Sequence, residues 1–189
     1  MRARAGRAPA ILAALAGALC LTAFMPRGAG TIGTLSETAP LIVLGRAVAS
    51  REAGAGATVW RLRVERVLRG KAPSGEVGLW VPDYAQGVRV KRGVRTLYFL
   101  SPVPDLPHFR RVHAAGKGLW RLAEIPSGIA EAALLPAVEA LIAARSGGNR
   151  DALVAVLLSQ AGDPNPRVRE DAAADLDRIC AAGCPLDAS

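Results

Sequence analysis

The pattern of apolar and polar residues favours β-strands along the middle of the chain, from about residue 41 to residue 124. The clearest segment has Trp60, Leu62 and Val64 separated by single charged residues. A period of two is typical of a β-strand with one buried face and one face in water. The phase of this alternation changes at 66–68, which predicts a bulge or the end of the strand.

Four more segments of this region have the pattern of short strands. Segments rich in Gly and Pro separate them, and no helical period lies between them. The pattern therefore predicts a small five-stranded antiparallel β-barrel of the OB-like kind over residues 31–126. The four segments are the β-branched run 41–48, the alternating run 77–81, the apolar run 95–100, and a final strand or hairpin over 109–112 and 118–122.

The apolar positions take a helical period after the predicted barrel, which indicates a helical tail over residues 127–189 and an α+β fold with about three helices. Asn149 and Asn165 each predict the start of a helix because Asn is a favoured N-cap, and Pro166 suits the first helical position. The apolar faces of the first and third helices are Leu134, Val138, Leu141 and Ile142, and Val168, Ala172, Leu176 and Ile179.

The acidic residues of the third predicted helix are expected to face water, Asp171, Asp175 and Asp177 among them. They lie outside the apolar stripe of that helix, and a cluster of charges opposite such a stripe is ordinarily a solvated face. Paired carboxylates for acid–base chemistry should instead share a cleft. These acids therefore predict no catalytic pair.

Two resemblances to known families follow from these segments. The runs 41–48, 64–70 and 93–100 resemble a pattern that recurs in exported bacterial proteins, and they are similar to the OB-fold barrel of the netrin/tissue-inhibitor-of-metalloproteinases type. In those inhibitors an N-terminal cysteine reaches the zinc of the target enzyme. No cysteine stands at the start of the expected mature chain, so inhibition by that route does not carry over.

The second resemblance is to a HEAT repeat, at its turn and second helix. It rests on the segment 163–169 followed by Ala172-Ala173 and Leu176. Units of this kind ordinarily need neighbours to bury a continuous core. A single HEAT-like pair is therefore expected to dock on the β-barrel, with dimerisation or a partner protein as alternatives.

The first 30 residues have the order of a Sec-type signal peptide. Arg2, Arg4 and Arg7 precede an uncharged apolar stretch at 10–21, and small residues follow at the expected cleavage point. We expect export to the periplasm or the extracellular space, with an uncleaved N-terminal anchor as the alternative. The net charge of the chain is +8, and cleavage after Ala23 would leave +5 on the mature protein, since those three arginines precede that point.

Cysteines and histidines offer few sites. Cys180 and Cys184 form a possible disulfide in an oxidising compartment, the alternative being two free thiols. His108 and His113 are the only histidines, and no motif pairs either of them with a nucleophile or an orienting carboxylate such as Asp105. We therefore predict no catalytic, cofactor-binding or metal-binding residues.

A basic stretch is the best candidate for contact with a partner, and aromatic residues nearby could provide stacking platforms. The leading hypothesis is an exported, non-catalytic binding or scaffold protein with a protein partner in the cell envelope. The alternatives are a regulator or inhibitor of an envelope enzyme that acts through the barrel, and a polyanion or nucleic-acid binder. The candidate surface residues are Tyr84, Arg89, Lys91, Arg92 and Arg95, with Arg61, Arg63, Arg66 and Arg69 upstream, and the aromatic candidates are Trp60, Trp80, Tyr84 and Tyr98.

Overall fold

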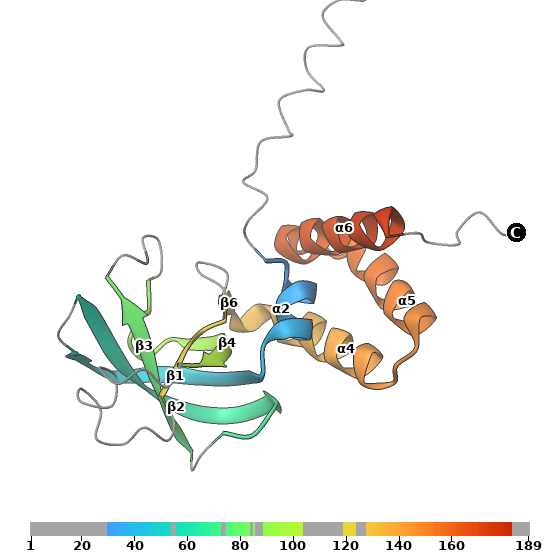
Figure 1. Ribbon diagram of the computed structural model, residues 1–189. Coiled ribbons are helices and arrows are strands. Elements are labelled where there is room, and N and C mark those ends of the chain that lie inside the picture. Colours follow the sequence, from blue (N-terminus) through green and yellow to red (C-terminus); the bar gives the residue numbers. More distant parts are fainter. Residues whose placement is uncertain are drawn as a thin grey trace, which may run out of the picture.

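The computed structural model describes residues 30–53, 56–72, 75–83, 85, 89–103, 119–123 and 128–182. A β-barrel lies on one side of the molecule and three helices on the other, with a short helix between them (Figure 1). In chain order the elements are α2 (Ile32–Thr38), β1 (Leu41–Glu52), β2 (Ala57–Arg69), β3 (Glu76–Pro82), β4 (Arg95–Pro102), β5 (Leu119–Leu122), β6 (Ile129–Glu131), a 3-10 turn (Ala132–Leu134), α4 (Leu135–Ser146), α5 (Arg150–Ala161) and α6 (Pro166–Ala181).

The barrel closes through five strands in the order β1-β2-β3-β5-β4, because β4 also pairs with β1. The predicted five-stranded barrel is confirmed, but the prediction that it is antiparallel throughout is wrong, since β3 and β5 are parallel. Strand directions cannot alternate all the way around a closed barrel with an odd number of strands, so one neighbouring pair must be parallel. The short strand β6, which the sequence did not predict, adds to β4 outside this closed set.

The long β1–β2 pair is bent by irregularities in its register. Ile42 lies opposite Arg69, whereas Val43 lies opposite Val67, so Leu68 is the extra residue. This confirms the bulge predicted at 66–68, and a second shift of the register leaves Glu65 as an extra residue. Bulges increase the local twist and re-aim side chains. Both changes matter here, because they help the barrel close and turn Glu65 toward its neighbours.

Two apolar cores lie on opposite faces of the same barrel wall. One fills the barrel and contains Leu62, Leu79 and Tyr98. The other lies outside, where Ile42, Leu44, Leu97 and Phe99 of β1 and β4 pack against the helices. Strands β1 and β4 are therefore buried on both faces, which explains why they are continuous apolar runs and not alternating ones.

The described residues contain four α-helices, so the predicted number of three is wrong. The additional helix, α2, precedes the barrel in the chain and packs against α4 and α6. The predicted starts of the last two helices are confirmed by their caps. Asn149 Oδ1 accepts from the backbone N–H of Asp151 at 2.8 Å, and Asn165 Oδ1 accepts from that of Arg167 at 3.0 Å.

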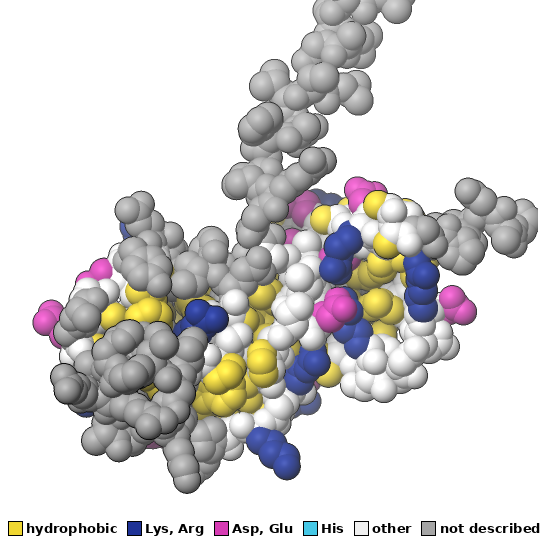
Figure 2. Space-filling model, viewed as in Figure 1, with side chains coloured by type: hydrophobic (Ala, Val, Ile, Leu, Met, Phe, Trp, Pro, Cys, Tyr) yellow, Lys and Arg dark blue, Asp and Glu magenta, His cyan; other side chains and the backbone are white. Residues whose placement is uncertain are grey.

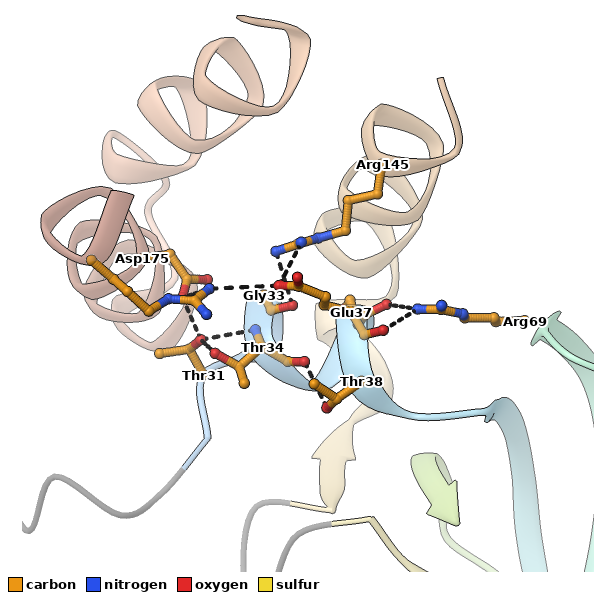
Figure 3. Close-up of polar contacts among 10 residues, drawn as sticks. Thr31, Gly33, Thr34, Glu37, Thr38, Arg69, Arg145 and Asp175 are labelled. Atoms are coloured by element: carbon orange, nitrogen blue, oxygen red, sulfur yellow. Dashed lines mark hydrogen bonds and ion pairs between the residues drawn. The ribbon is translucent and has the colours of Figure 1, made fainter. Parts of the chain in front are cut away.

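Helix α6 holds the beginning of α2 through its acidic face (Figure 3). Thr31 Oγ1 donates to Asp175 Oδ1 at 2.6 Å, and the backbone N–H of Ile32 donates to Asp171 Oδ2 at 2.9 Å. Asp175 is only 1% exposed, so the prediction that it faces water is wrong. Carboxylates are favourable partners for the unpaired N–H groups at a helix start. The start of α2 therefore covers the acidic face of α6.

The other end of α2 is held by the barrel and by α4. The guanidinium of Arg69, at the end of β2, donates to the backbone carbonyls of Ser36 and Glu37. The Glu37 carboxylate forms an ion pair with Arg145 of α4 at 2.7 Å. A cation at the C-terminal end of a helix satisfies its unpaired carbonyls and interacts favourably with its dipole. Helix α2 is thereby fixed between barrel and helices.

Candidate functional site

A cleft of about 520 Å³ opens at one end of the barrel, and we call it the mouth cleft. The start of β2 and the end of β3 form two of its walls. These two ends are neighbours, because Thr58 of β2 lies opposite Val81 of β3 and Trp60 lies opposite Leu79. The segment 89–91 closes the remaining side. The lining residues are Thr58, Trp60, Val81, Pro82, Asp83, Ala85, Arg89, Val90 and Lys91.

The floor of the mouth cleft is continuous with the interior of the barrel. Trp60, Val81 and Val90 are partly buried and pack against the interior core. The sequence placed Trp60 on the same face as Leu62, and the register confirms this, although the ring also borders the open cleft. Tyr98 is 1% exposed within the barrel, so it cannot serve as a stacking platform as proposed. Among the described residues that line the cleft, Trp60 is the aromatic ring.

Two cations border the cleft. Arg89 and Lys91 face a single acidic lining residue, Asp83, and neither cation forms an ion pair with another described residue. Guanidinium and ammonium groups on an apolar, aromatic floor suit a ligand with negative charge and some apolar surface. The mouth cleft is thus chemically suited to an anionic ligand.

A second basic feature lies on the outer face of the barrel, beyond the part that the helices cover. Arg63, Arg46 and Arg95 lie directly opposite one another on β2, β1 and β4. Residues in register share one face of a sheet, so these three guanidinium groups form an arginine row across three strands. All three are exposed.

Like charges placed directly opposite are unfavourable, and Glu65 offsets this repulsion. Its carboxylate accepts from Arg46 Nε and from Arg95 Nε, each at 2.7 Å. The hydrogen bond from Arg46 is the main reason why the pKa of Glu65 lies below its usual value. Glu65 can take this position because it is the extra residue in the β2 register. Arg63 forms no ion pair with any described residue and contributes uncompensated charge to this face.

The basic surface predicted from the sequence is therefore divided between two places. Arg89 and Lys91 lie at the mouth cleft, whereas Arg95 belongs to the arginine row on the outer face. Arg92 forms an isolated bridge with Ala47 of β1 between the two features. The outward position of Arg46 was not predicted from the sequence. Its signal was present, because Ile42, Leu44 and Arg46 are two residues apart along β1 and therefore lie on the same, outer face. Tyr84 lies outside the described residues.

Several other predicted residues also fall outside the described part of the chain. They include the expected signal peptide at 1–29, both histidines, Asp105 and Cys184. Cys180 is exposed near the end of α6, so the possible disulfide with Cys184 stays a prediction. Within the described ranges, no group of three or more His, Cys, Asp or Glu side chains is arranged to hold a metal ion.

No protein-family model matches the chain, and no curated protein matches it either. None of the helices in the described residues has the length and apolar character needed to cross a membrane. Lys and Arg side chains are scattered over the visible face of the molecule, and several gather where the helices meet the barrel (Figure 2). Function must therefore be argued from the chemistry of these surfaces.

Proposed function

We propose that the protein is an exported, non-catalytic binding protein of the cell envelope, and that it holds an acidic segment of a protein partner in the mouth cleft. The observation that carries this proposal is the combination of Trp60 with Arg89 and Lys91 around one cleft. An aromatic floor supplies apolar contact area, and two cations that form no ion pair with a described residue are available for carboxylates.

The order of charge and hydropathy in the first 30 residues supports export. The closed five-strand barrel followed by helices supports the finer proposal of a netrin-type OB barrel with a HEAT-like α5–α6 pair. In this proposal α5 packs on α4 and α6 packs on α2, so the helical pair is joined to the barrel through α4, which contacts β2, and the mouth cleft stays open. The barrel supplies the binding surface and the helices brace it.

The test is quantitative capture from a cell-envelope extract with the full chain as bait. The double variant Arg89→Gln/Lys91→Gln removes both cations of the mouth cleft and keeps the polar character of the side chains. Exposed charge contacts contribute about 0.5–1 kcal/mol each, so we expect captured partner to fall about tenfold. The matched control is Arg121→Gln/Arg169→Gln, which removes the same charge from exposed positions outside the cleft.

Unchanged capture by the double variant would show that the mouth cleft is not the binding surface. An equal loss in the control variant would assign the effect to net charge. The mass of the protein recovered from the envelope fraction tests the export part separately, since a cleaved leader lowers it. Full-length protein confined to the cytosol would contradict export.

The arginine row favours one alternative, a polyanion such as nucleic acid or an acidic polysaccharide. Repeated guanidinium groups along a surface suit a ligand with regularly spaced negative charge. Binding to heparin would then weaken steeply with salt, and Arg63→Gln would reduce the slope of that dependence by about one. Heparin binding that is absent, or that Arg63→Gln leaves unchanged, would favour the protein partner at the mouth cleft.

A further inference from the structure

A second cleft, also of about 520 Å³, lies where the barrel meets the helices, and we call it the junction cleft. It is bounded by the end of α2, the end of β2, the last turns of α4 and the first turn of α5. Helices α4 and α5 follow one another in the chain, whereas α2 and β2 are distant from them in the sequence and are brought to them by the docking of α2. The lining residues are Ser36, Glu37, Leu68, Arg69, Ile142, Ala144, Arg145, Ser146, Gly148, Asn149, Arg150 and Leu153.

The polar lining of the junction cleft is predominantly cationic. Arg69, Arg145 and Arg150 contribute three guanidinium groups, against the single carboxylate of Glu37. Arg69 and Arg145 are held in place by their contacts with α2 (Figure 3). Arg150 makes only a long contact of 3.5 Å with the carbonyl of Ile179, so its guanidinium is available to a ligand.

Two polar atoms that border this cleft lack hydrogen-bond partners among the described residues. They are the hydroxyl oxygen of Ser36 and Nε of Arg145. Ser36 is 0% exposed, and the Arg145 guanidinium otherwise contacts Glu37 and the carbonyl of Gly33. A buried donor left unpaired is costly, and such groups ordinarily have a partner. Both are donors, and because almost none of their surface is accessible, an oxyanion could accept from them only after a local side-chain rearrangement.

The remaining wall is apolar and comes from three different elements. Leu68, Ile142 and Leu153 line the cleft from β2, α4 and α5, and each is partly buried against the outer core. This wall would cover a short hydrocarbon chain whose end carries the charge. A volume of this size lies within the range of small-molecule sites.

From this arrangement we propose that the junction cleft binds a small amphiphile with an anionic head group and a short apolar chain. The head group pairs with the exposed Arg150 guanidinium and, after a local side-chain rearrangement, accepts from Ser36 Oγ and Arg145 Nε, while the chain lies on Leu68, Ile142 and Leu153. The bound molecule would bridge barrel and helices, and so raise resistance to unfolding. This site is separate from the mouth cleft and does not depend on the proposed function.

Isothermal titration of the full chain with three probes tests the proposal. Octyl phosphate and octanoate share the proposed chemistry and distinguish a phosphate from a carboxylate head group, and inorganic phosphate lacks the apolar chain. We expect one of the two octyl compounds to bind at a single site at least tenfold more tightly than inorganic phosphate. Failure of both to bind, or affinity no greater than that of inorganic phosphate, would overturn the proposal.

Variants locate the site. Arg150→Gln should weaken binding of the tighter probe at least fivefold, and Ser36→Ala at least threefold. Because the Ser36 hydroxyl lacks a partner in the free protein, Ser36→Ala should leave the melting temperature without ligand unchanged or raised. The control Arg121→Gln removes one charge from β5, outside the cleft, and should change affinity less than twofold. Equal losses in Arg150→Gln and the control, or unchanged binding in Ser36→Ala and Arg150→Gln, would overturn the assignment.

Discussion

Replacement of Gly33 by Ala tests the buried contact between α2 and α6. A Cβ at this position would meet three atoms, all of them in the carboxyl group of Asp175, and the nearest would lie far inside contact distance. Ala in a helix is ordinarily about 1 kcal/mol more favourable than Gly. At this site the gain cannot be realised unless Asp175 or α2 moves.

The expected cost follows from what Asp175 would lose. Its Oδ1 accepts from Thr31 Oγ1 at 2.6 Å and from Arg178 at 3.1 Å. Hydrogen bonds to charged groups contribute about 1.5–3 kcal/mol, and overpacking costs about 1–3 kcal/mol. After subtraction of the helix-propensity gain, we expect Gly33→Ala to lower the free energy of unfolding by about 2–3 kcal/mol.

A double-mutant cycle with Asp175→Ala separates this contact from other effects of the substitution. Once the carboxyl group is removed, the new methyl group has space, and Gly33→Ala should raise the free energy of unfolding by up to about 1 kcal/mol. The coupling energy should therefore be about 3 kcal/mol, measured by urea unfolding followed by circular dichroism. A coupling below about 0.5 kcal/mol would refute the reasoning, because residues in contact should not be additive.

Three further predictions concern the same framework. Burial raises the pKa of Asp175 above its usual 3.8, so the unfolding free energy contributed by this group falls as pH rises from that value through the raised pKa. Asp175→Asn should remove this fall in urea titrations that start at the usual value and go upward in pH. Gly45→Ala should lower the melting temperature by about 8 °C or more, since a Cβ there would lie 2.5 Å from the backbone oxygen of Arg63, and an unchanged melting temperature would contradict the close approach of β1 and β2. Asn165→Ala should cost about 1 kcal/mol in urea unfolding through loss of the cap on the Arg167 N–H, with Asn165→Asp as a near-neutral control.

Much of the fold could be predicted from patterns among residues that are close together in the sequence. The alternation around Trp60, the bulge at 66–68 and the Asn caps at 149 and 165 depend on neighbours a few residues away, so they could be read along the chain. The parallel β3–β5 pair also follows from a closed barrel of five strands, although alternation alone does not indicate direction. The antiparallel prediction rested on the absence of helices between the strands, which does not give the direction of the pair that closes the barrel.

Helix α2 and the burial of Asp175 could not be obtained in this way. Thr31 as an N-cap and Pro40 as a stop are weak signals over seven helical residues, and the partners of α2 on α4 and α6 lie more than a hundred residues away. An amphipathic pattern assigns the acidic face of α6 to water unless another element is known to cover it. Here that element comes from the opposite end of the chain.

The candidate sites divide along the same line. Strand period, helix period and charge are local properties of a sequence. They were therefore enough to predict a β-barrel with a basic surface in the middle of the chain and helices after it. Tertiary structure decided that Arg89 and Lys91 border a cleft with Trp60, that Arg46, Arg63 and Arg95 align across three strands, and that a second cleft lies at the junction. Such groupings depend on strand register and helix docking, in which energies are summed over residues far apart in the chain.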